Sequence, residues 1–405
     1  MLATTQAATQ KALDAFVALA GQRVWTTRLE EIRDLAVAGP RAGQAIRQRH
    51  AIELTIERMR RATQTPATLA ERLLGTIVME TVALAKGLAP DGRRRLAGMA
   101  QSALTGESTL VPLFHLVRTA ALQRSRGFKV TYAGLEDGAP FDLLLRRDQI
   151  EAEVACDVTS AEEGRGVHRG AWFRLADRID PDLQTWLSAH PGRYLLKMTL
   201  PRGLRGGLCD PADQGDSLAE LHRRIRAMLE THTRHDHDEA IVLRLDPLLL
   251  AGAQADDTGL MPSLRREFGP EAHLSVTTAG RGVFVMAARA GRENDIAAAI
   301  RKRMAGFAPT RLTGDRPGIL AIFVEDIDRT EWRGLRDRLE LEGEARQFLT
   351  RPEARPVVAV TFSSRLELFG VKAPDAAVDG EVRFRNPGHP AARAAALAPA
   401  ILSSV

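Results

Sequence analysis

The chain has few cysteines and no long apolar run. Only Cys156 and Cys209 occur in 405 residues, so neither a disulfide framework nor a set of cysteine zinc ligands is available. No apolar stretch approaches the roughly 20 residues that a membrane span requires. The first twenty residues lack the basic start and compact apolar block of a signal peptide. We therefore expect a soluble, cytoplasmic protein of bacterial type with no membrane partner.

Several familiar catalytic signatures are also missing. The sequence contains no G-x-S-x-G nucleophile elbow, no P-loop and no protein-kinase signature. The glycine-rich stretches at 203–207 and 280–282 do not stand at a strand-to-helix turn of the kind that cradles phosphate. These absences argue against serine hydrolases of the α/β type and against nucleotide-dependent enzymes.

The basic residues are concentrated in the first quarter of the chain. The net charge is +5, from 56 Lys and Arg against 51 Asp and Glu, whereas residues 1–100 alone hold fifteen basic and nine acidic residues, or +6. Contacts to nucleic acid phosphates come mainly from Arg and Lys. The triplet Arg93, Arg94 and Arg95 is a candidate DNA contact, although such a triplet is also typical of a solvated helix face.

Periodicity and breaks predict a mixed α/β protein in three parts. Residues 1–105 have helical spacing throughout, with breaks that suggest about four helices, and form the expected basic, all-helical region. Residues 106–201 alternate helix and strand. Residues 202–405 read as a C-terminal α/β extension with further strands and helices.

The central part has the element order α-β-β-β-α-β. Apolar periodicity and β-rich runs place these elements, in chain order, at 109–123, 128–135, 141–147, 150–158, 168–188 and 193–200.

This order, together with the segment FDLLLRRDQIEAEVACDV, resembles the core of the PD-(D/E)xK superfamily, which has the restriction-endonuclease-like fold. The resemblance covers 106–201 and implies a metal-dependent nuclease. It implies that an Asp at the start of the second strand and a Glu in the third hold Mg²⁺ or Mn²⁺, here Asp142 and Glu153. The extra carboxylate that many members take from the first helix corresponds to Glu107.

The expected hairpin geometry supports a paired acidic site. A turn centred between Arg147 and Asp148 places Asp142 directly opposite Glu153, on the face that also carries Glu151. Carboxylates opposed in this way repel each other unless a cation lies between them. A divalent ion with oxygen ligands would remove that repulsion and activate a water molecule.

One position departs from the motif. The superfamily's Lys, two residues after the Glu, is replaced by Ala155. Glu153 can stand in for that Lys in an E-x-E variant, with Glu151 as the acid. Alternatively a basic group comes from elsewhere, from Lys197 or from Arg169 and Arg174, or the site is inactive.

Three functions follow from this interpretation. The first is a metal-dependent DNA phosphodiesterase with Asp142, Glu151, Glu153 and Lys197 as catalytic residues and Asp142, Glu153 and Glu107 as metal ligands. The second is a catalytically inactive nuclease-fold protein that binds DNA or protein. The third is a structural or assembly protein with no nucleic-acid role.

Overall fold

The computed structural model divides the chain into two compact units. It describes residues 2–62, 68–207, 216–248, 257–269, 272–365 and 381–404. The first unit comprises residues 1–31, 49–163 and 297–405, and the second comprises residues 32–48 and 164–296. None of the described helices is both long enough and apolar enough to span a membrane.

The N-terminal part is helical, as the spacing predicts, but it has more helices than expected. They are α1 (Leu2–Ala20), α2 (Gln22–Leu35), α3 (Pro40–Arg49), α4 (Ala51–Arg61), α5 (Leu69–Gly87) and α6 (Pro90–Ser102). One additional break is at Gly21, whose φ of 91° is left-handed and ends α1. The stretch Gln64-Thr65-Pro66, one of the breaks on which the expected helix count rests, falls outside the described residues.

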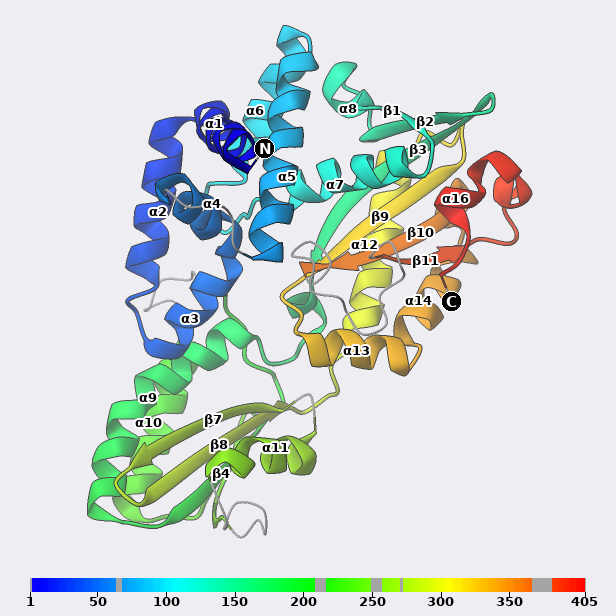
Figure 1. The fold of residues 1–405 in the computed structure, drawn as a ribbon. Coiled ribbons are helices and arrows are strands. Elements are labelled where there is room, and N and C mark those ends of the chain that lie inside the picture. The colour runs from blue at the N-terminus through cyan, green and yellow to red at the C-terminus, as the bar shows by residue number, and fades with distance from the viewer. Residues whose placement is uncertain are drawn as a thin grey trace. The chain divides into compact units, whose positions relative to one another are not determined.

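The first unit contains a mixed six-stranded sheet (Figure 1). Its strand order is β1-β2-β3-β9-β10-β11. The central strands β3, β9 and β10 are parallel, and the other pairs are antiparallel. The strands are β1 (Lys129–Thr131), β2 (Leu143–Arg147), β3 (Ile150–Ser160), β9 (Gly318–Glu325), β10 (Val357–Ser364) and β11 (Val382–Arg385).

Helices cover the two faces of this sheet. Helix α7 (Val111–Ser125) packs on the apolar face, where Leu143, Leu145, Ala152 and Val154 join the main core. Helix α12 (Ile296–Arg311) lies against the opposite face and is tied to it by side-chain bonds from Arg303 and Arg311. The unit also holds α8 (Ala133–Glu136), α13 (Arg329–Asp337), α14 (Glu340–Leu349) and α16 (Ala398–Ile401).

The second unit has its own five-stranded sheet, in the order β5-β6-β4-β8-β7. Only β4 and β8 are parallel. The strands are β4 (Arg193–Leu200), β5 (His235–His237), β6 (Val242–Pro247), β7 (His273–Ala279) and β8 (Gly282–Ala290). Helices α9 (Arg169–Ala189) and α10 (Asp216–Thr231) share a core with one face, and α11 (Asp257–Phe268) packs on the other.

This division corrects the predicted nuclease-like core. The helix expected at 168–188 and the strand expected at 193–200 exist, but as α9 and β4 they belong to the second unit, and β4 pairs with β6 and β8 rather than with β3. In the first unit the elements that follow β3 are α12 and β9, with β9 parallel to β3. The order α-β-β-β-α-β is therefore completed by elements beyond residue 295, and the second unit's residues 164–296 are inserted between β3 and α12.

A buried histidine links α7 to the sheet. The Nε2 atom of His115 donates to the carbonyl oxygen of Ala321 in β9 at 2.9 Å. Burial lowers the pKa of His115 from 6.5 to about 4, although the carbonyl partner acts to raise it. The His115 ring is therefore neutral in the folded protein, because protonating it there costs more free energy than in the unfolded chain.

Acidification should therefore destabilise the protein through His115. Because the folded-state pKa lies below the unfolded one, the contribution is complete above pH 6.5 and is lost between pH 6.5 and about 4. It amounts to about 3 kcal/mol at about 1.4 kcal/mol per pKa unit. Urea unfolding of His115→Gln should show a decline in unfolding free energy over this range that is shallower by that amount. Equal declines in the variant and the unsubstituted protein would contradict the assignment.

Candidate functional site

The predicted acidic residues lie on one face of the β2–β3 hairpin, but not in the predicted register. Glu153 is opposite Leu144, not Asp142. The turn consists of Asp148 and Gln149, both with left-handed φ values of 48° and 64°, one residue later than expected. Asp142 and Glu153 are therefore diagonal neighbours on the same face, which we call the acidic face. Its other carboxylates are Glu151 and Asp157.

Asp142 is held by a strand backbone and by an arginine of α12. Its Oδ2 atom accepts from the backbone N–H of Cys156 at 2.7 Å, and its Oδ1 atom accepts from Nη2 of Arg311 at 2.7 Å. Burial raises the pKa of Asp142, and the charge of Arg311 opposes that effect. Both oxygens of this carboxylate thus have donors from the protein itself.

Glu153 is fully buried and bound by the loop that follows α12. Its Oε2 atom accepts from the backbone N–H of Thr313 at 2.9 Å, and its Oε1 atom accepts from the Thr313 hydroxyl at 2.5 Å. Nη1 of Arg316 lies 3.5 Å from Oε1. The carboxylate therefore fixes the chain just before β9 begins.

The remaining carboxylates of the acidic face also pair with arginines. Glu151 accepts from Arg146 at 2.6 Å and from Arg316 at 2.7 Å, and these two bonds lower its pKa. Asp157 binds Arg303 through two bonds of 2.6 and 2.9 Å. Arginines thus neutralise the face that was expected to hold a metal ion.

The basic residues proposed as substitutes for the motif Lys lie in the second unit. Lys197, on β4, is 3.7 Å from Asp246 and 5.8 Å from the ring centre of Phe268. Arg169 and Arg174 are on α9. Ala155, at the motif position itself, has no exposed surface.

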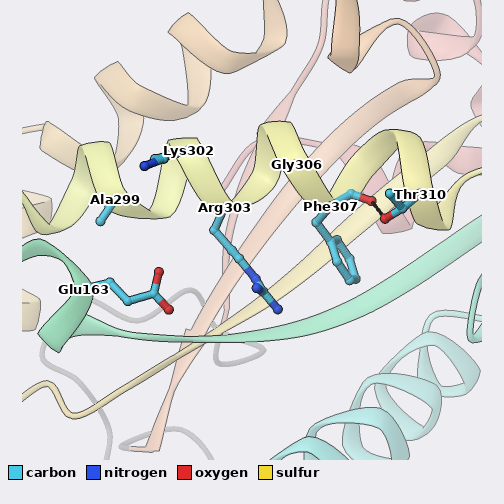
Figure 2. Close-up of a pocket in the computed structure, with 7 residues that line it drawn as sticks. All are labelled: Glu163, Ala299, Lys302, Arg303, Gly306, Phe307 and Thr310. Carbon is cyan, nitrogen blue, oxygen red and sulfur yellow. Dashed lines mark hydrogen bonds between the residues drawn. The ribbon is translucent and has the colours of Figure 1, made fainter.

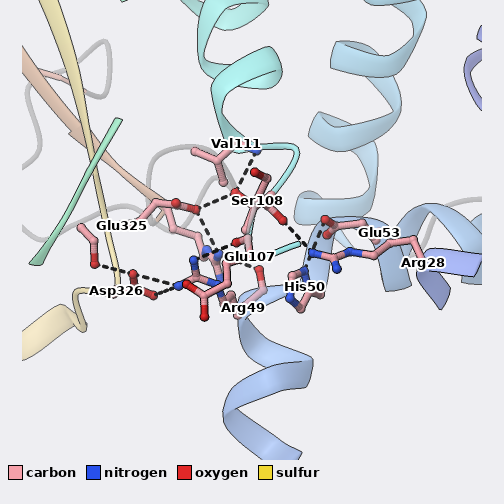
Figure 3. A network of polar contacts seen from close by, with 12 residues as sticks. Arg28, Arg49, His50, Glu53, Glu107, Ser108, Val111, Glu325 and Asp326 are labelled. Carbon is pink, nitrogen blue, oxygen red and sulfur yellow. Dashed lines mark hydrogen bonds and ion pairs between the residues drawn. The ribbon is translucent and has the colours of Figure 1, made fainter. Parts of the chain in front are cut away.

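Glu107 belongs to a different polar cluster, at the carboxyl ends of β3 and β9 (Figure 3). Its carbonyl oxygen accepts from Arg49, which also binds both carboxylate oxygens of Asp326 at 2.9 and 3.0 Å. Ser160, the last residue of β3, donates to Asp326 at 2.6 Å. Asp326 has a left-handed φ of 56°. Its pKa is lowered: burial acts to raise it, but Arg49 and Ser160 prevail.

The arginine triplet at the start of α6 is largely engaged in structural bonds. Arg93 donates to the carbonyl of Ala85, and Arg95 donates to the carbonyls of Leu135 and Glu136. Arg94 pairs with Asp91 on its own helix at 2.6 Å. These bonds favour the reading of the triplet as part of the helix surface.

The structure brings Asp142, Glu151 and Glu153 together on the acidic face, whereas Glu107 belongs to the cluster at Asp326 and Lys197 lies in the second unit. In the part of the chain that the structure describes, no group of three or more His, Cys, Asp or Glu side chains is placed to hold a metal ion. Sequence reasoning missed the partners of the acidic face, Arg303, Arg311, Thr313 and Arg316. They lie about 150 residues or more from the acids they bind, so no local pattern marks them.

A groove runs along α12, with Glu163 across from the helix (Figure 2). Its volume is about 550 Å³, and its lining is Glu163, Ala299, Lys302, Arg303, Gly306, Phe307 and Thr310. A side chain at Gly306 would meet no atom within 4 Å, so this position leaves the groove open. Among the described residues, no carboxylate pairs with Lys302, whereas Arg303 is shared with Asp157. We call this feature the α12 groove.

Comparison with known proteins finds no match: no family model, no curated protein and no solved structure is significantly similar to this chain.

The hydrogen bonds of the buried Glu153 carboxylate predict that its removal lowers stability strongly. Glu153→Ala removes a fully buried carboxylate together with its two charge-assisted hydrogen bonds from Thr313, so we expect a loss of about 2–4 kcal/mol in unfolding free energy. Glu151→Ala, the matched control, removes a partly exposed pair and should cost below about 1 kcal/mol. Urea unfolding of both variants without divalent metal measures these changes in unfolding free energy. A stabilised Glu153→Ala variant would instead indicate mutually repelling carboxylates that await a cation.

Proposed function

We propose that the first unit binds the phosphate backbone of DNA without cutting it, on a scaffold of the restriction-endonuclease-like type. The observation that carries this proposal is the state of the acidic face: each of its four carboxylates is paired with an arginine. Three of those arginines, Arg303, Arg311 and Arg316, come from α12 and the loop after it. The acids thus have a structural role that needs no metal.

The scaffold part of the proposal is supported by element order and strand direction. Helix α7 precedes the antiparallel strands β1, β2 and β3, and α12 then leads to β9, which is parallel to β3. Asp142 stands directly before β2 and Glu153 lies within β3, as in the motif of that superfamily. The buried Ala155 in place of the Lys favours a scaffold that does not hydrolyse.

The DNA-binding part rests on the α12 groove. Lys302 offers a positive charge that no described carboxylate neutralises, and Arg303 next to it retains donors beyond those bound to Asp157. The ring of Phe307 forms part of the wall, with the guanidinium of Arg311 5.1 Å from its centre. Cations beside an aromatic surface are typical of grooves that follow a nucleic acid backbone. Among the described residues, by contrast, the large exposed apolar side chains are few and occur singly along the chain.

A metal-dependent phosphodiesterase is the competing proposal, with Asp142 and Glu153 holding Mg²⁺ or Mn²⁺. It requires the ion to displace Arg311 from Asp142, and Arg316 and Thr313 from Glu153. Incubation of the full chain with single- and double-stranded DNA and either metal separates the two. We expect no cleavage. Divalent-dependent cleavage that disappears in Glu153→Gln would overturn our proposal.

Binding itself is tested by fluorescence anisotropy with labelled DNA over a series of salt concentrations. Lys302→Ala removes one phosphate contact, so we expect affinity to fall severalfold and the salt dependence to weaken by about one counterion. Lys86→Ala, an exposed lysine on α5 with the same charge change, is the matched control and should bind like the unsubstituted protein. Equal loss in both variants would assign the effect to overall charge, and no binding at low salt would refute the proposal.

A further inference from the structure

The second unit contains a pocket at the carboxyl ends of its two parallel strands. Its volume is about 470 Å³. Thr199 near the end of β4 and Arg289 near the end of β8 line it, together with Phe268 from α11 and His273 from β7. The carboxyl ends of parallel strands are the usual location of ligands in open α/β sheets. None of the sequence motifs points to this place.

Two arginines give the pocket unused positive charge. Arg289 and Arg292 both line it and both are exposed, so a ligand can reach them. Neither forms an ion pair with any carboxylate in the described parts of the chain. One acid, Glu293, also lines the pocket, so the balance of charge at the wall remains positive. Unpaired guanidinium groups at a concave site favour phosphate or carboxylate ligands, which they can bind with two parallel hydrogen bonds.

The electrostatics around His273 agree with a positive field. Burial, and after it the nearby charges of Arg165, Arg169 and Arg265, together lower its pKa from 6.5 to about 3. The imidazole is therefore neutral at physiological pH. It can then exchange a hydrogen bond with a ligand without adding a charge of its own.

The loop that carries Arg292 is fixed by backbone bonds. The N–H of Gly291 donates to Leu200 at 3.0 Å, the side chain of Asn294 accepts from Gly166 at 3.1 Å, and the N–H of Asp295 donates to Gly164 at 2.8 Å. A Cβ atom at Gly291 would lie 2.8 Å from Cα of Pro201, so glycine is required for this close approach. The wall is thus preorganised, and binding does not have to pay for its ordering.

Phe268 adds a flat apolar surface to the same pocket. Its ring is partly buried against the core beneath α11, and the ammonium of Lys197 lies 5.8 Å from its centre. A ligand that uses both halves of the pocket would carry an anionic group toward Arg289 and Arg292 and a planar ring against Phe268.

We propose that this pocket binds a small phosphorylated ligand with a planar ring, of the nucleotide class. The phosphate is held by Arg289 and Arg292, and the ring packs on Phe268. This site lies in the second unit and does not depend on DNA binding by the first.

Isothermal titration calorimetry of the full chain tests the proposal, with nucleoside 5′-monophosphates and inorganic phosphate as separate probes. We expect saturable binding of at least one nucleotide, and weaker binding of phosphate alone. Arg289→Gln and Arg292→Gln should each weaken nucleotide binding by about tenfold or more, the effect of losing a charge-assisted hydrogen bond. Phe268→Leu should weaken nucleotide binding but leave phosphate binding unchanged.

Arg281→Gln is the matched control, because Arg281 is an exposed arginine just before β8, at the end of the strand away from the pocket. It should bind nucleotides like the unsubstituted protein, and thermal unfolding should show all variants folded. No saturable binding of either probe at millimolar concentrations would overturn the proposal. So would nucleotide binding that persists unchanged in the Arg289→Gln/Arg292→Gln double variant. Nucleotides that bind no more tightly than phosphate would refute the nucleotide class.

Discussion

The first unit depends on the pairing of the acidic face of β2 and β3 with arginines of α12 and the loop after it. Alternation along the strands puts four carboxylates on one side of the sheet, where they would repel one another if left alone. Arg303, Arg311 and Arg316 supply the opposite charge. Since Glu153 also holds the backbone of Thr313 just before β9, the same interactions that neutralise the acids guide the chain into the parallel strand beside β3.

Arginines also bind carboxylates and backbone carbonyls elsewhere in this unit. Arg49 neutralises Asp326 at the end of β9, and the buried Arg28 donates to the carbonyls of Gly106 and Ser108 (Figure 3). The planar guanidinium group of arginine suits such paired contacts with carboxylates and carbonyls. A high arginine content is therefore a poor guide to nucleic acid contact in this chain, and the position of each unpaired cation is more informative than the total charge.

Local sequence patterns predicted local structure well and long-range pairing poorly. The strand at 193–200 was placed by its apolar run, and it has those bounds. Nothing in 193–200 indicates that it pairs with β6 and β8 instead of β3, because partner choice depends on residues far along the chain. The hairpin turn was misplaced by one residue because Asp148 and Gln149 adopt left-handed backbone angles without the Asn or Gly that usually signals them.

The chemistry of the candidate site could be predicted only in part, for the same reason. Sequence could place Asp142, Glu151 and Glu153 on one face, but whether such a face binds a cation or a guanidinium depends on what packs against it. Here the donors arrive from residues 303–316, beyond an insertion of more than a hundred residues. A divalent ion would therefore have to replace partly buried hydrogen bonds that position α12 and β9. In this unit a metal ion and the segment of α12 and its loop would compete for the same carboxylate oxygens. In the structure these oxygens bind Arg311 and Thr313 of that segment.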